Sequence, residues 1–461
     1  MKGLRKDGLV MKVQKRRVAY DGFAVGNKKD GVLSADECRN CDCRGGVLRG
    51  GVGLDTFVSD KGNEIKLAAA LAQPKRFFKT AVQDNYGVWT GVIGYVTEEN
   101  VVYVYDEGAS AWEKQGAFSL PVFPVTAIDS DCVPQTLFVG ENGVFLWQDG
   151  KGMLATKITE PVVAACFFRG RLFVAIAPFT VRYSAPYAPT DFADSLDDGG
   201  SIVFYSDKGN IVAFAPLKNA LCIFYERGIA VIEYAASGSG FVRKDVAYGG
   251  GRIFGRSVGV CAVGGEKAVF LADDGLYVFD GNGVKRTCEN LEILPKWDTR
   301  VCDHVQTDGR YVLTYTDEWD GLKTVVLDVE SGEGCFTFVP TGLGGGDGVA
   351  LCAYGNKVRR LCLGGDLPDG EERIFTAHGV EFGNVGVKTL KTLAFTGDGE
   401  FTMTVKNGKK EKNFAVVLKN GRACVRVDMR GRAFDLAFVL QKGAAVQSVV
   451  ADIEVLQSVG E

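Results

Sequence analysis

The chain has 461 residues and a formal net charge of -4, which gives no overall reason for it to bind nucleic acid or an anionic membrane surface. Its 60 glycines and 12 prolines, with 46% hydrophobic residues, exclude collagen and disorder and favour many short turns between strands. No run of about 18 uncharged apolar residues occurs, so we expect a soluble protein without a membrane-spanning helix.

The first seventeen residues carry a local excess of positive charge. Seven cations stand against the single acid Asp7: Lys2, Arg5, Lys6, Lys12, Lys15, Arg16 and Arg17. They fit best a solvated arm or an edge strand over 10–18, and the alternative is a surface that contacts nucleic acid or a protein partner. We treat these seven residues as the candidate contact site.

The 13 cysteines are mostly single residues within apolar runs, which is typical of buried thiols in a reducing compartment and not of a disulfide scaffold. The exception is the segment Cys38-Arg39-Asn40-Cys41-Asp42-Cys43. A C-x-x-C pair supplies half of a zinc site, but tetrahedral zinc needs four ligands, and His304 and His378 have no neighbouring ligand in the sequence. We therefore predict no metal, and the role of the cluster stays open.

Short runs of β-branched and aromatic residues joined by glycine-centred turns recur through most of the chain. In the clearest unit, 162–194, two apolar runs flank the turn Arg169-Gly170-Arg171, which predicts a hairpin and not a helix. Similar units follow one another: 91–118, 127–157, 162–194, 209–234, 258–286, 301–338 and 349–362. Their spacing is that of four-stranded propeller blades, about 35–50 residues. A long stacked-sheet sandwich is the alternative.

These patterns predict an all-β chain in three parts. Residues 1–64 form an N-terminal arm and an irregular Gly- and Cys-rich segment, 65–375 a β-propeller of about six or seven blades, and 376–461 a C-terminal β-sandwich. Within 65–72, an alanine-rich stretch before Pro74 predicts the only short helix, although it fits a strand equally well. Asn407-Gly408 is the strongest hairpin signal of the chain.

Residues suited to catalysis are scarce, so we predict no enzyme, no catalytic residues and no cofactor. The two histidines are more than seventy residues apart in sequence, which leaves little material for a catalytic triad or a histidine metal site. The pentapeptide Ser-Asp-Lys-Gly-Asn occurs at 59–63 and again at 206–210, and both copies predict ordinary turns. A carbohydrate site would need exposed aromatic rings beside paired acids. Its candidates are Trp112, Trp147, Trp319, Asp317, Glu318 and Asp320.

Three segments resemble tail-associated virion proteins of tailed bacteriophages. They are RGRLFVA followed by VRYSAPYAPTDF, then LKNALCIFYERGI at 217–229, and RGRAFDL at 430–436 in the last strands. The resemblance is to the packaged-DNA stabilisation, tail-hub and tail-nozzle proteins of short-tailed phages, and it covers roughly residues 85–455. These motifs contain no catalytic residue.

The resemblance implies a virion structural protein that is made in the host cytoplasm and located in the tail or neck. It would form a homo-oligomeric ring, usually six-fold, around the DNA channel. Its partners would be the portal, adaptor or other tail proteins, with non-specific contact to packaged or passing DNA and none to a membrane. Two alternatives stay open: a carbohydrate-binding or glycan-degrading propeller, and a monomeric cellular interaction scaffold.

Overall fold

The computed structural model describes residues 4–6, 9–25, 31–68, 72–83, 87–193, 199–218, 220–234, 241–262, 265–289, 291–297, 303–346, 348–408 and 410–459. They form strands and turns with two short 3-10 segments, Arg44–Gly46 and Gly255–Ser257. In these ranges no helix has the length and apolarity needed to cross a bilayer. The chain divides into two compact units: Asp55–Gly332 with Val339–Leu361, and Met1–Leu54 with Glu333–Phe338 and Cys362–Glu461.

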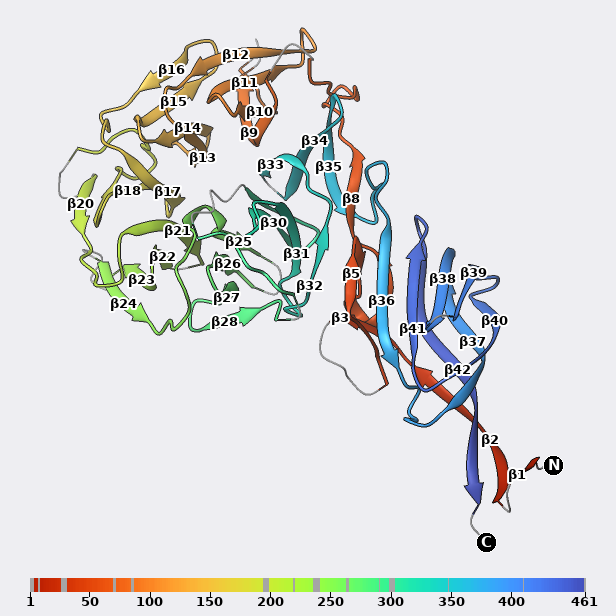
Figure 1. Cartoon of the computed structure of the whole chain (residues 1–461). Coiled ribbons are helices and arrows are strands. Elements are labelled where there is room, and N and C mark those ends of the chain that lie inside the picture. Colours follow the sequence, from red (N-terminus) through yellow and green to blue (C-terminus); the bar gives the residue numbers. More distant parts are fainter. Residues whose placement is uncertain are drawn as a thin grey trace. The chain divides into compact units, whose positions relative to one another are not determined.

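The first of these units is a β-propeller, as predicted. Its strands form successive antiparallel groups arranged around a common centre (Figure 1). The groups are β9 (Pro74–Gln83), β10 (Trp89–Thr97), β11 (Val101–Asp106), β12 (Ala111–Ala117); β13 (Val122–Ile128), β14 (Pro134–Gly140), β15 (Gly143–Gln148), β16 (Gly152–Ala155); β17 (Val162–Phe168), β18 (Arg171–Ile176), β19 (Thr180–Tyr183), β20 (Gly200–Val203); β21 (Ile211–Leu217), β22 (Ala220–Tyr225), β23 (Gly228–Tyr234), β24 (Phe241–Val246); β25 (Gly259–Cys261), β26 (Lys267–Ala272), β27 (Gly275–Phe279), β28 (Val284–Thr287); β29 (His304–Thr307), β30 (Arg310–Thr316), β31 (Leu322–Asp328); and β33 (Thr341–Gly346), β34 (Val349–Tyr354), β35 (Lys357–Leu363).

Each predicted repeat unit overlaps one of these groups, although the unit predicted at 301–338 also includes the strand Gly334–Thr337, which belongs to the second unit. The turn residues have the conformation that the sequence requires. The turn between β17 and β18 has positive φ at Arg169 (48°) and Gly170 (76°). Positive φ at both central positions is the requirement of the tight turns that join twisted antiparallel strands. The unit predicted at 91–118 lacked its first strand, β9, which precedes it.

Neighbouring groups are held together by apolar side chains between their sheets. Phe78 and Phe138 meet edge-on between the first and second groups, with ring centroids 5.3 Å apart, and Phe224 and Phe270 do so between the fourth and fifth at 5.2 Å. Such contacts bury both faces of sheets that are too small to be stable alone. The last group joins the first through a parallel pairing of β33 with β9, at Gly345 and Phe78, which closes the ring.

The stretch from Ile65 to Leu67 is extended, so the helical alternative predicted for 65–72 is wrong. Ile65 and Leu67 are buried whereas Lys66 between them is exposed, which is the period of a strand. Lys66 also forms an isolated β-bridge with Lys357. Burial of alternate apolar side chains outweighs the helix propensity of the neighbouring alanines. Ala69 and Ala70 lie outside the described residues.

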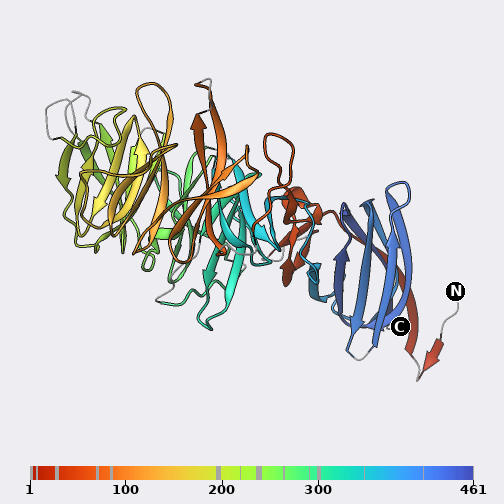
Figure 2. The ribbon, with the colours of Figure 1, turned by 90° about the horizontal axis from the view of Figure 1, so that it is seen from above.

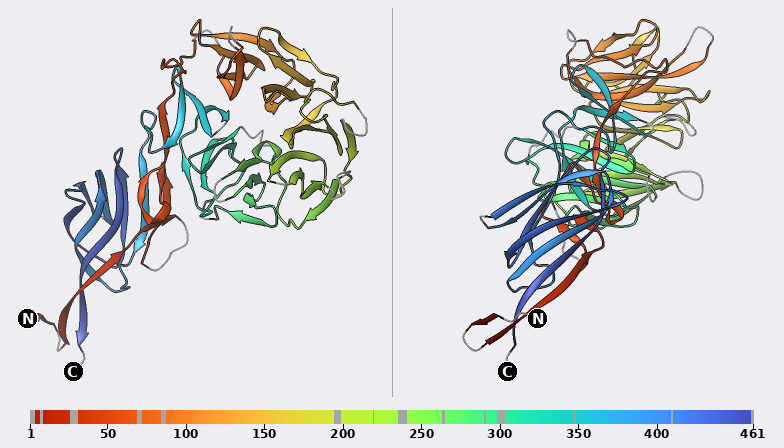
Figure 3. Two further views of the ribbon diagram at one scale, coloured as in Figure 1. Left: turned by 180° about the vertical axis from the view of Figure 1, so that it is seen from behind. Right: turned by 90° about the vertical axis from the view of Figure 1, so that its right-hand side faces the viewer.

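The second unit combines strands from both ends of the chain. One sheet has the order β1-β2-β42-β37-β40, with β6 and β7 attached, and another contains β32-β5-β36-β41-β38-β39. The bounds of the strands in this unit are β1 (Leu4–Lys6), β2 (Leu9–Tyr20), β3 (Phe23–Val25), β4 (Leu33–Ala35), β5 (Glu37–Arg39), β6 (Cys41–Asp42), β7 (Leu48–Gly50), β32 (Gly334–Thr337), β36 (Arg373–Val380), β37 (Lys388–Asp398), β38 (Glu400–Asn407), β39 (Lys410–Val417), β40 (Arg422–Gly431), β41 (Phe434–Leu440) and β42 (Ala445–Val459), and β8 (Val52–Thr56) lies at the boundary. Figure 3 shows β2 beside the long strand β42.

Aromatic rings connect the two sheets of this unit. Phe395 on β37 contacts Phe401 on β38 and Phe438 on β41, with centroids 5.2 and 6.2 Å apart. Asn407 pairs with Lys410 across the turn from β38 to β39, so the hairpin predicted at Asn407-Gly408 is confirmed. A separate C-terminal sandwich over 376–461 is not confirmed, because β2, β5 and β7 of the N-terminal segment pair into the same sheets.

Candidate functional site

The first candidate site is a pair of cavities between the first strands of the propeller groups. Their volumes are about 880 and 410 Å³, and they share several lining residues. The shared residues come from different groups: Lys75, Pro121, Glu141, Val212, Gly255, Arg256 and Asp303. Figure 2 shows the propeller groups turned by 90° about the horizontal axis from the view of Figure 1.

Ion pairs neutralise much of the charge in these cavities. Lys75 Nζ lies 3.3 Å from Glu98 Oε2, and Arg76 Nη1 lies 3.4 Å from Asp303 Oδ1. Burial raises the pKa of Asp303, and the charge of Arg76 partly opposes this shift. The cavity walls are therefore a mixture of apolar side chains and paired charges, which suits solvent or a weakly held ligand better than a strongly charged one.

His304 lines the narrower cavity beside Asp303. Its Nδ1 donates to the carbonyl oxygen of Arg256 at 3.0 Å, and its ring stacks on Tyr311 with centroids 5.4 Å apart. Burial, with the nearby charge of Arg76, lowers the pKa of His304 to about 4. A neutral imidazole with one nitrogen already engaged is held in place as part of the cavity wall.

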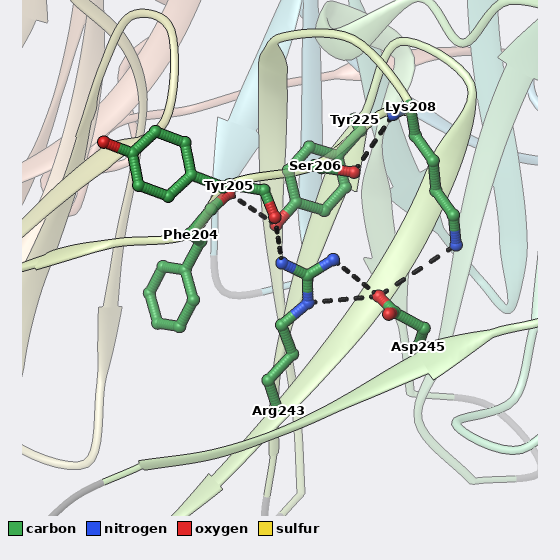
Figure 4. Close-up of polar contacts among 7 residues, drawn as sticks. All are labelled: Phe204, Tyr205, Ser206, Lys208, Tyr225, Arg243 and Asp245. Atoms are coloured by element: carbon green, nitrogen blue, oxygen red, sulfur yellow. Dashed lines mark hydrogen bonds and ion pairs between the residues drawn. The ribbon is translucent and has the colours of Figure 1, made fainter.

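A second polar cluster lies where β24 meets the segment after β20 (Figure 4). The guanidinium of Arg243 donates from Nε and Nη2 to Asp245 Oδ1, at 3.1 and 2.7 Å, and from Nη1 to the carbonyl oxygen of Tyr205 at 2.6 Å. It also lies over the ring of Tyr225, 5.4 Å from the centroid. Since all three guanidinium nitrogens are engaged, the cluster fixes the 204–208 loop and is a structural feature.

That loop contains the second copy of the repeated pentapeptide. Lys208 N donates to Ser206 Oγ at 3.1 Å, and Gly209 has φ 89°. In the first copy, Gly62 has φ 79° and donates to the carbonyl oxygen of Ser59 at 2.8 Å. Both copies are turns, as predicted.

The predicted contact residues lie on β1 and β2, apart from Lys2, which is outside the described residues. Arg5 and Lys6 are in β1, and Lys12, Lys15, Arg16 and Arg17 are in β2. Lys15, Arg16 and Arg17 are exposed. Arg17 Nε lies 3.9 Å from Asp452 Oδ1, and because both side chains are more than half exposed this pair contributes little to stability. The structure thus places at least three of the predicted cations together on one accessible strand.

The candidates for a carbohydrate site do not gather around one surface. Trp112 is half-buried and donates to the carbonyl oxygen of Lys66 at 2.8 Å, and Trp147 is buried. Trp319 is 80% exposed, but its neighbour Asp317 forms an ion pair with Lys323 at 2.9 Å. Asp320 likewise pairs with Lys296, at 2.5 Å.

Comparison with known proteins adds no chemistry to this picture. No family model and no curated protein matches the chain. The solved structures that it resembles include a streptogramin B lyase (10% identity, 68% of this chain and 98% of that one, TM-score 0.44), U3-55K (11%, 68% and 98%, 0.42) and the β-propeller domain of Cps50 (Swd1) from Myceliophteria thermophila (11%, 67% and 98%, 0.41). Similarities at this level of identity carry no inference about activity.

The residues that sequence reasoning missed are those brought together by the ring. Arg76 and Asp303 come from the first and sixth groups of the propeller, and no local motif marks either one. Only the expectation that the first strands of successive blades line an axis would have pointed to them.

Proposed function

We propose that the chain is a non-enzymatic structural protein of a tailed-phage virion that assembles with copies of itself into a ring around the DNA channel. The observation that carries this proposal is the open edge of β2. Among the described strands, β2 pairs with β42 along residues 10–20, and its other edge pairs with β1 only at residues 9–11. The remaining edge coincides with the exposed Lys15, Arg16 and Arg17.

An open strand edge presents N–H and C=O groups that a strand of another chain can pair with. Lysine and arginine at such an edge discourage indiscriminate pairing, so a specific partner must supply negative charge beside its own strand edge. An acidic segment of a neighbouring copy or the phosphates of DNA would both satisfy this condition. The propeller suits a scaffold because its groups are packed on one another and form a rigid block.

The resemblance to tail-hub and tail-nozzle proteins supports the proposed ring. The net charge of the chain and its few exposed cations are both compatible with a ring around DNA. A net charge of -4 would keep DNA from adhering along the whole inner surface. A few exposed cations would still permit non-specific contact with phosphate, without reading base sequence.

The test is to replace Lys12, Lys15, Arg16 and Arg17 together by alanine. We expect the variant to lose assembly, measured as mass by sedimentation velocity, or to lose DNA binding, measured by a shift in electrophoretic mobility at low salt. A matched control replaces four exposed lysines of the propeller: Lys114, Lys151, Lys157 and Lys285. Assembly and DNA binding that match wild type in the first variant would contradict the proposal.

A second candidate is a carbohydrate-binding propeller, favoured by the larger axial cavity. Trp297, which is 75% exposed, lines it together with Glu98 and Asp303. An exposed indole beside carboxylates is a common platform for a sugar ring. Binding on a glycan array that is lost in Trp297→Ala would favour this candidate over the scaffold.

A further inference from the structure

Four buried thiols from two distant parts of the chain meet in the second unit. Cys38 is on β5, Cys41 and Cys43 follow within five residues, and Cys335 is on β32. Their exposed fractions are 4%, 1%, 6% and 7% in that order. The Cys38 thiol is within hydrogen-bonding reach of the other three thiols, and Cys335 Sγ donates to the carbonyl oxygen of Cys41 at 3.0 Å.

The backbone holds the two segments in register. β32 pairs in parallel with β5 at Phe336 and Arg39. The fully buried Asn40 accepts at Oδ1 from Thr337 Oγ1, at 2.9 Å, and from Phe338 N, at 3.1 Å. Its φ of 55° turns the chain between Cys38 and Cys41. The spacing of the thiols is therefore set by strand pairing and one buried amide.

A buried cation with an unused donor stands next to the thiols. Arg373 is 7% exposed, and its Nε has no hydrogen-bond partner among the described residues. Its Nε lies 2.7 Å from the place where a side chain on Gly50 would begin, and Gly50 pairs with Cys41 in the β6–β7 ladder. Burying an unpaired guanidinium nitrogen is costly unless a negatively charged acceptor forms beside it.

We propose that Cys38, Cys41, Cys43 and Cys335 form a structural Zn²⁺ site that ties β32 to the N-terminal segment. Four cysteine sulfurs that begin with a C-x-x-C pair are the donor set of closed, tetrahedral zinc sites. Binding converts four neutral thiols and one Zn²⁺ into a tetrathiolate complex of charge -2 and releases four protons. Arg373 offsets part of that charge and gains an acceptor for Nε, as outer-shell donors do in metal sites.

In the structure as it stands, the sulfurs are thiols in contact with one another. No group of three or more His, Cys, Asp or Glu among the described residues is arranged to hold a metal ion. Metal binding therefore requires the cysteine side chains to turn toward a common point, and rotation about χ1 is the movement that staggered rotamers offer. The competing outcome for four adjacent thiols is a disulfide, and the experiment separates the two.

The test uses the full chain purified under reducing conditions, with zinc content measured by elemental mass spectrometry and Co²⁺ as a spectroscopic probe. We expect stoichiometric zinc, and on Co²⁺ exchange the intense absorption of a tetrahedral thiolate complex. Cys335→Ser should lower metal retention against a chelator at least about tenfold. The matched control is Cys352→Ser, a buried thiol on β34 of the propeller, which should retain zinc as wild type does.

Three results would overturn the proposal. The first is wild-type protein that holds neither zinc nor Co²⁺, which remains decisive even where Cys335→Ser fails to fold. The second is full retention in Cys335→Ser. The third is a disulfide between Cys38 and a neighbour, found by mass spectrometry in protein prepared with zinc present and without reductant.

Discussion

The side chain of His304 makes the stability of the propeller depend on pH. Its pKa in the folded protein is about 4, below the ordinary value near 6.5, so between these values the unfolded chain binds a proton that the folded chain does not. Above about pH 6.5, His304 is neutral in both states and the unfolding free energy is not reduced. As the pH falls toward 4, the unfolded chain takes up a proton and the unfolding free energy decreases progressively. The loss should amount to up to about 3 kcal/mol.

Urea denaturation at a series of pH values checks this prediction. The difference in unfolding free energy between wild type and His304→Gln should shrink steadily from pH 7 to pH 4.5, because glutamine does not titrate. A difference that stays constant over this range would show that His304 does not carry the effect.

Arg310 and Asp328 form a buried ion pair between β30 and β31. Arg310 Nη1 lies 3.5 Å from Asp328 Oδ2, and their side chains are 2% and 7% exposed. Asp328→Asn keeps the shape of the side chain that accepts the turn N–H groups of Glu330 and Ser331, yet removes the charge opposite Arg310. We expect a loss of about 3 kcal/mol in unfolding free energy by chemical denaturation.

The double variant Arg310→Met with Asp328→Asn serves as the control for this pair. It leaves no buried charge uncompensated, so it should recover at least half of the loss. Additive losses in a double-mutant cycle would show that the two side chains do not depend on each other.

At the scale of the element, glycines in the turns decide how closely neighbouring strands approach. Gly143, at the start of β15, has φ 99°, and a side chain there would begin 2.2 Å from the carbonyl oxygen of Ile158. Gly150 also has a positive φ, of 69°, but nothing lies within 4 Å of its missing side chain. The two positions therefore separate backbone strain from steric conflict.

Gly150→Ala should cost about 1 kcal/mol of unfolding free energy, the cost of a left-handed conformation for an alanine. Gly143→Ala should cost about 3 kcal/mol, because overpacking against the backbone adds to the same strain. Thermal or urea denaturation of both variants measures the difference. Equal losses would mean that the segment around Ile158 moves aside without cost.

The sequence could predict some of the strands and hairpins but not others. Hairpins such as the one at Gly170 were visible because two apolar runs and a glycine turn are local in the chain. β9 was missed because it begins at Pro74, directly after an alanine-rich stretch that also fits a helix, and one of its two partners, β33, lies more than 250 residues later. Distance in sequence also explains why Cys335 was not connected with Cys38, so the cysteine cluster had one thiol fewer than the proposed zinc site needs.

At the scale of the whole molecule, length and repeat spacing were enough to predict a propeller, because each blade is a nearly complete local unit. The pairing of β2 with β42 joins the two ends of the chain, and a pattern of single strands carries no information about partners so distant. The axial cavities share this limit, since their residues come from every part of the ring.

The proposed scaffold role requires the chain to assemble with copies of itself. The mass and shape of the purified protein test this requirement most directly. Purified wild-type chain should be weighed by sedimentation velocity over a range of concentrations and imaged by electron microscopy. We expect a closed ring of identical copies with a central opening. A particle of 49.6 kDa that stays monomeric at every concentration would contradict it.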